Sequence, residues 1–88
     1  MKIQSIEIDK STDGRDLVVV TIDVDPTVSN RSLVVIIYRF YTYGQHVVIQ
    51  PLSCVTDDTH EAVTFTPPEN ERIYQAVLDH VETTLWSY

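Results

Sequence analysis

The middle of this 88-residue chain contains no acidic residue, although both flanking regions are acidic. Residues 1–30 hold six acids and three bases, residues 31–56 hold two bases, and residues 57–88 hold seven acids and one base. Valine and isoleucine prevail among the apolar residues, and such β-branched side chains favour strands. The pattern predicts strands buried in a sheet, with the acidic charge on the surrounding surface.

The length predicts one domain, residues 1–88. A single cysteine, Cys54, excludes a disulfide within the chain and fits a reducing compartment. The first residues lack the apolar stretch of a secretory signal, and the apolar run 33–37 is too short to span a bilayer. We therefore expect a cytoplasmic protein, in the host cytoplasm if a virus encodes it, with no membrane partner.

Alternating apolar residues predict strands over about residues 3–9 and 17–25, joined by a hairpin. Two turns are compatible with the residues between them. One is a two-residue turn at Asp13-Gly14, and the other is a three-residue turn at Thr12-Asp13-Gly14 with the glycine in the left-handed region.

The apolar pattern favours the three-residue turn. Only that turn places Ile8 opposite Val18 and Ile6 opposite Val20, and a one-residue slip would turn every side chain to the other face. The opposite face then carries an acidic row with apolar neighbours: Glu7, Asp9, Asp23, Asp25, Ile3, Leu17 and Val19.

Two further strands are predicted over about residues 33–43 and 46–55, with a tight turn at Gly44-Gln45 between them. Pro51 indicates that the second of these strands lies at a sheet edge or contains a bulge. A short fifth strand is expected over residues 61–66, with Val63 and Phe65 pointing inward.

The Gly44-Gln45 turn determines which side chains share a face, and it places Cys54 opposite Val35. The expected core face carries Val34, Ile36, Tyr38, Phe40, Val47, Ile49 and Val55. The other face carries Val35, Ile37, Arg39, Tyr41, Tyr43, His46, Val48, Gln50 and Leu52.

Residues 67–86 are predicted to form one amphipathic helix. Thr66 and Glu69 have the spacing of a capping box, and Pro67 suits the first helical position. An apolar residue then recurs every four positions, at Ile73, Val77, Val81 and Leu85. The expected fold class is α+β: a five-stranded, mainly antiparallel β-meander with one C-terminal amphipathic helix packed on one face.

A single helix covers only one face of a sheet. The other face would keep exposed aliphatic and tyrosine side chains, and such area on a small protein usually marks a contact surface. We therefore expect that face to bind a partner protein or to form a homodimer.

The residues show no signature of catalysis or of a metal or cofactor site. The cluster Asp57-Asp58-Thr59-His60-Glu61 matches no zinc or calcium spacing and fits a solvated turn. The strand separates Cys54 from His46 by roughly 26 Å, whereas His60 and His80 remain geometrically open as partners; the favoured interpretation of Cys54 is a small packing side chain. Paired carboxylates such as Asp23 and Asp25 lack an obvious pocket and fit surface charge.

The patch Arg39, Tyr41, Tyr43 and His46 is the main candidate for an interaction site on the middle strands. Arginine and tyrosine are common anchors of protein interfaces, although ordinary cross-strand packing would also explain them. Base stacking is disfavoured, since a net charge of −7 opposes direct binding of nucleic acid.

The leading functional hypothesis is a small acidic, non-catalytic inhibitor that occupies the basic, nucleic-acid-binding surface of a larger protein. Virus-encoded anti-CRISPR and anti-restriction proteins are of this general type, and the likeness is one of type only. The acids expected to contact the partner are either Glu7, Asp9, Asp23 and Asp25, or Asp57, Asp58 and Glu61.

The alternative is a structural component of a phage particle or multisubunit complex that oligomerises through its open sheet face. A weaker third hypothesis is an enzyme that uses Cys54 or a carboxylate pair.

Overall fold

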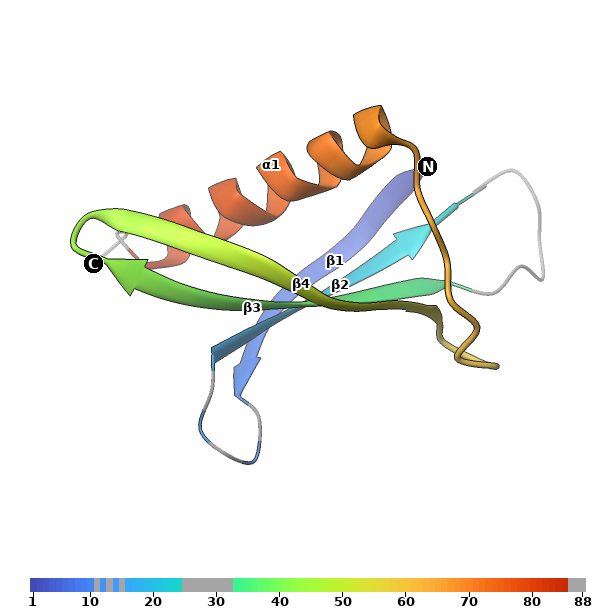
Figure 1. The fold of residues 1–88 in the computed structure, drawn as a ribbon, viewed down its shortest axis with the longest axis horizontal. Helices are drawn as coiled ribbons and strands as arrows, with labels where there is room; N and C mark the ends of the chain where they lie inside the picture. The colour runs from blue at the N-terminus through green and yellow to red at the C-terminus, as the bar shows by residue number, and fades with distance from the viewer. Residues whose placement is uncertain (11, 13, 15, 25–32, 86–88) are drawn as a thin grey trace.

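A computed structural model describes residues 1–10, 12, 14, 16–24 and 33–85. Four strands form an antiparallel meander sheet in the order β1 (Lys2–Lys10), β2 (Asp16–Asp23), β3 (Val34–Tyr43) and β4 (His46–Thr56). The helix α1 (Pro67–Leu85) lies against one side of this sheet (Figure 1). The α+β class and the meander are thus confirmed. Asp25 and Trp86, at the ends of a predicted strand and of the predicted helix, lie outside the described residues.

The predicted fifth strand, residues 61–66, is wrong. This segment pairs with the sheet only through an isolated bridge between Val55 and Ala62, beside which the Val63 N–H donates to the Cys54 carbonyl at 3.0 Å. The chain then leaves the sheet edge, because Phe65 enters the core and the helix begins two residues later. The inward positions expected for Phe65 and Val63 are nevertheless confirmed, since Phe65 is buried and Val63 packs against the core.

The register of β1 and β2 is the predicted one. Ile8 lies opposite Val18 and Ile6 lies opposite Val20, and Gly14 has a φ of +85°, in the left-handed region. The three-residue turn therefore agrees with the observed pairing.

A bulge in β1 corrects the predicted position of Ile3. Ile3 pairs with Ile22 and Ser5 pairs with Thr21, which leaves Gln4 as the extra residue. One inserted residue reverses the alternation of the side chains that precede it. Ile3 therefore packs against the core and does not share the face of Glu7.

A second bulge, at Leu52 in β4, corrects two more positions. The predicted pairs of Tyr43 with His46 and Arg39 with Gln50 are confirmed. Beyond the bulge, Cys54 lies opposite Ile36 and packs against the core, and Val55 lies opposite Val35 on the other face. The predictions that Cys54 faces Val35 and that Val55 joins the core are therefore wrong. Pro51 indicated the cause correctly, since β4 is an edge strand and is bulged beside it.

At the start of the helix Glu69 reaches back to Thr66, which is the half of the predicted capping box made by the glutamate. The Thr66 backbone N–H and hydroxyl both donate to Glu69 Oε1, at 3.0 and 2.8 Å. Ile73, Val77 and Val81 of α1 are completely buried against the sheet. The predicted start, spacing and inward face of the helix are thus confirmed.

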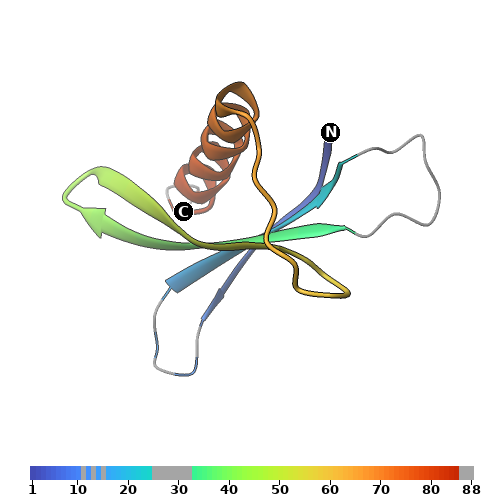
Figure 2. The same cartoon turned by 45° about the vertical axis from the view of Figure 1, so that its right-hand side comes forward.

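The two faces of the sheet differ in what covers them. We call the side beneath α1 the covered face and the other side the open face; in the described part of the chain no helix lies on the open face (Figure 2). The covered face holds the core: Val18, Val20, Ile22, Val34, Ile36, Tyr38, Phe40, Ile49, Phe65, Ile73, Val77 and Val81. Within the described residues, no helix combines the length and apolar character needed to cross a membrane.

Candidate functional site

The open face has an aliphatic centre. Its strands place side chains from β2, β3 and β4 in neighbouring cross-strand rows, and each of these side chains is half-buried, with no helix above it among the described residues. We call this group the apolar centre; it consists of Leu17, Val19, Val35, Ile37 and Val55. The sequence predicted an uncovered apolar face, and this surface has that character.

Acidic side chains border the apolar centre on the β1 side. Glu7 lies opposite Val19 and Asp9 lies opposite Leu17, so both carboxylates project from the outer strand of the open face. Alternate residues along a strand are about 6.6 Å apart, which is the spacing expected between these two positions. Together they form the β1 acidic pair.

Asp23, a member of the predicted acidic row, lies apart from Glu7 and Asp9. Asp23 lies near the far end of β2, opposite Lys2, and its Oδ2 accepts a weak hydrogen bond of 3.5 Å from Gln4 Nε2. It is four residues along β2 from Val19, the partner of Glu7, or about 13 Å along the strand. Asp25, the fourth member of the predicted row, lies outside the described residues.

The patch predicted on the middle strands divides into two parts. Arg39 continues the row of Asp9 and Leu17 on the open face, and its guanidinium carbon lies 5.8 Å from the centre of the Tyr41 ring. That distance is in the range of a cation–π contact. Tyr43 and His46 instead form the last pair of the hairpin and are both exposed, with Tyr43 exposed to 75%.

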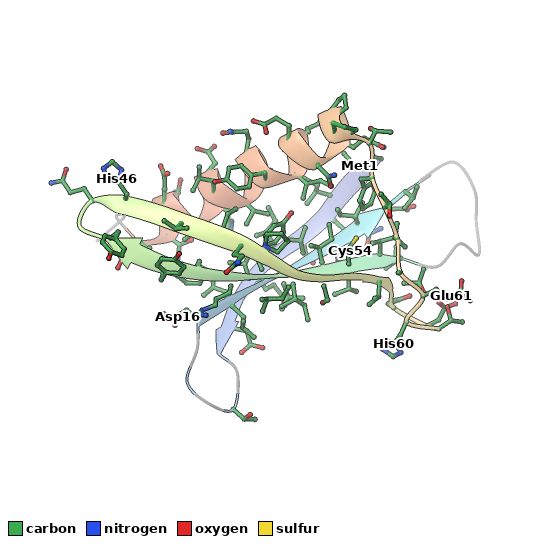
Figure 3. The ribbon with its side chains drawn as sticks, in the orientation of Figure 1. Met1, Asp16, His46, Cys54, His60 and Glu61 are labelled. Carbon is green, nitrogen blue, oxygen red and sulfur yellow. The ribbon has the colours of Figure 1, made fainter. Side chains whose placement is uncertain are left out.

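The acidic turn after β4 is an ordered structure. The Asp58 carboxylate accepts a 2.7 Å hydrogen bond from the Thr59 N–H, and Thr56 Oγ1 accepts one of 3.0 Å from the Glu61 N–H. The side chains of Asp57, Asp58 and Glu61 are exposed. This turn lies at one end of the long axis and His46 lies at the other, so the structure does not combine the two groups into one site (Figure 3).

Two of the three histidines and the cysteine lie in different parts of the molecule. His46 and His60 lie at opposite ends of the molecule, and Cys54 lies between sheet and helix (Figure 3). Burial raises the pKa of the Cys54 thiol and so favours its unreactive, protonated form. Among the described residues, no three His, Cys, Asp or Glu side chains are grouped so that they could hold a metal ion.

A groove that the sequence did not predict opens between α1 and β4 on the covered face, with a volume of about 500 Å³. Its sheet side consists of Ile36, Tyr38, Pro51 and Cys54. Its helix side consists of Pro67, Asn70, Glu71 and Tyr74. Burial, and to a smaller extent the neighbouring Cys54, raise the pKa of Tyr38.

Two structural features that the sequence pattern does not reveal create this groove. The bulge at Leu52 turns Cys54 inward, and the position of α1 across the sheet brings Glu71 and Tyr74 above β4. Glu71 lines the groove and is also exposed to solvent. Pro51 was the one available signal, because it indicated an irregular edge at this position.

Comparison with protein-family models, with curated proteins and with solved structures gives no match to this chain.

Proposed function

We propose that this protein is a non-catalytic protein-binding module whose open face is the interface. The observation that carries the proposal is the apolar centre, an aliphatic area on the side of the sheet that lacks a helix. The β1 acidic pair borders it on the β1 side, and Arg39 and Tyr41 follow Ile37 along β3. An apolar centre with a polar rim is the usual anatomy of a protein interface.

The proposed partner is a larger protein with a basic surface. Glu7 and Asp9 would meet lysine and arginine side chains that otherwise hold phosphate, and the net charge of −7 would accelerate the encounter. The apolar centre and Tyr41 would supply most of the affinity. The protein would thus inhibit nucleic-acid binding in the cytoplasm by competition, as virus-encoded anti-CRISPR and anti-restriction proteins do.

The chemistry of Cys54 favours binding over catalysis. A nucleophilic cysteine needs a lowered pKa or an adjacent base, whereas burial raises the pKa of this thiol. A Cys54→Ser variant should therefore inhibit as well as the wild type. Loss of activity in that variant with an unchanged fold would support an enzyme instead.

Affinity capture from host lysate with matched charge variants tests the proposal. The Glu7→Lys variant changes the open face, and the Asp79→Lys variant makes the same charge change on the exposed side of α1. We expect a basic protein that is captured at low salt, released at high salt and displaced by nucleic acid. Glu7→Lys should reduce this capture and Asp79→Lys should leave most of it. Equal loss with both variants would show a non-specific charge effect and contradict the proposal.

A second candidate, a self-assembling structural component, is favoured by one observation. Asp9, Leu17 and Arg39 lie in one cross-strand row on β1, β2 and β3. A two-fold axis along β2 would stack Leu17 on its own copy and place Asp9 above Arg39 of the second molecule.

Sedimentation in high salt separates the two candidates. An assembly component should remain a dimer, which Arg39→Asp weakens and the double variant Asp9→Arg/Arg39→Asp restores. The inhibitor should sediment as a monomer in high salt.

A further inference from the structure

We propose that the groove between α1 and β4 binds an arginine side chain from an extended segment of a partner protein. This site lies on the covered face, so the inference does not depend on the open-face interface. Its volume of about 500 Å³ is sufficient for one long side chain and the adjoining backbone.

The backbone of β4 disfavours the alternative of an added strand at this place. Pro51 has no N–H to donate, and the Cys54 carbonyl already accepts a hydrogen bond of 3.0 Å from Val63. Strand addition depends on a row of unpaired main-chain donors and acceptors. We therefore assign recognition in the groove mainly to side chains.

The lining of the groove suits an arginine. Pro51 and Tyr74 provide apolar surface for the methylene stem, and the buried Tyr38 forms the floor behind them. The one charged residue among the groove residues is Glu71, and none of them is basic. A bound cation therefore meets charge of the opposite sign only.

Glu71 has a hydrogen-bond partner on its own helix. Its Oε1 accepts a hydrogen bond of 3.1 Å from Gln75 Nε2, one turn along α1. A carboxylate has further lone pairs, so it can also accept from a guanidinium. Arginine suits the site better than lysine, because its planar head group can pair with a carboxylate and stack on a tyrosine ring at the same time.

Two isosteric ligands test the proposal directly. N-acetyl-arginine amide and N-acetyl-citrulline amide differ in the charge of the head group, and each is titrated into the isotope-labelled protein by NMR. We expect saturable shifts at the amides of Cys54, Glu71 and Tyr74. The citrulline compound should bind about threefold more weakly or worse, as expected for loss of a partly exposed ion pair. Shifts that do not saturate, or that lie elsewhere, would overturn the proposal.

Charge-neutralising variants locate the site within α1. Glu71→Gln should remove the preference for arginine over citrulline, whereas Asp79→Asn, an equal change at an exposed position two turns further along the helix, should preserve it. An equal effect of the two variants would contradict a specific site. Glu7→Lys, which tests the open face, should leave the titration unchanged. The groove proposal and the proposed function are therefore tested by different variants, and one can be refuted without the other.

Discussion

The covered and open faces both carry aliphatic residues on the same strands, yet these residues are buried to different extents. On β2, Val18 and Val20 are fully buried, whereas Leu17 and Val19, which alternate with them, are half-buried. Within the described residues, α1 lies on the side of Val18 and Val20 and not on the side of Leu17 and Val19. The chain therefore encodes more apolar sheet surface than its own helix can cover, and that excess is the basis of the proposed function.

Two adjacent isoleucines on β3 provide the strongest test of this difference. Ile36→Ala on the covered face should lower the free energy of unfolding by about 2–5 kcal/mol, because it leaves a cavity in the core. Ile37→Ala on the open face should cost only about 1 kcal/mol, since the side chain is half-buried. Urea denaturation measures both values. Equal losses of unfolding free energy would mean that the two faces are equally packed and would contradict the difference between them.

Thiol reactivity compares the accessibility of the two faces at the adjacent residues 53 and 54. Burial raises the pKa of Cys54, so little thiolate is present near neutral pH and labelling should be slow. A cysteine moved to the open face, in the double variant Ser53→Cys/Cys54→Ser, should react about tenfold faster. Labelling with a chromogenic disulfide as a function of pH gives both rates. A faster rate for Cys54 would show that the groove leaves the thiol accessible and its pKa unraised.

The helix cap tests how the covered face is maintained. Thr66→Ala removes the capping residue of α1 and should lower the free energy of unfolding by about 1 kcal/mol. Thr83→Ala, at an exposed position inside the same helix, should change it by less than about 0.5 kcal/mol. Thermal or urea denaturation distinguishes the two. A Thr66→Ala variant as stable as wild type would show that packing alone determines where the helix starts.

The smallest expected effect is a pH dependence at Glu69. Hydrogen bonds from the Thr66 backbone and then from its hydroxyl lower the pKa of this carboxyl below its ordinary value of 4.5. The charged form is thus favoured in the folded state, so this contribution is present above that value and is lost as the pH falls through the lowered pKa. The stability difference between wild type and Glu69→Ala should therefore shrink on acidification. A difference that is constant with pH would contradict this role.

Local patterns predicted most of the fold. Alternation along β2 and β3 assigned the two faces correctly, and the β1–β2 register followed from matching Ile8 with Val18. Thr66 and Glu69 predicted where the helix begins. These features depend on residues close together in sequence or on one hairpin, which is why periodicity reveals them.

The wrong predictions arise from the bulges and from long-range packing. Nothing in the sequence around Gln4 indicated a bulge, so Ile3 was placed on the wrong face. Residues 61–66 have the alternation of a strand, but the need to bring Phe65 into the core directs them away from the sheet edge. Tertiary packing here outweighs local propensity.

The candidate site was only partly predictable. An apolar open face followed from having one helix for one sheet, whereas the separation of Asp23 from Glu7 and Asp9 depends on the distances along the strands. The groove required both the bulge at Leu52 and the position of α1, and neither is a property of local sequence.

Site-specific photocrosslinking in cells tests the central claim most directly. A benzophenone amino acid replaces Ile37 in the apolar centre, and in a matched variant it replaces Asp79 on the exposed side of α1. We predict a discrete protein adduct from position 37 and little or none from position 79, with the mass distinguishing a second copy from a larger partner. A folded variant that forms no adduct at position 37, or the same adducts at both positions, would contradict the claim that the open face is an interface.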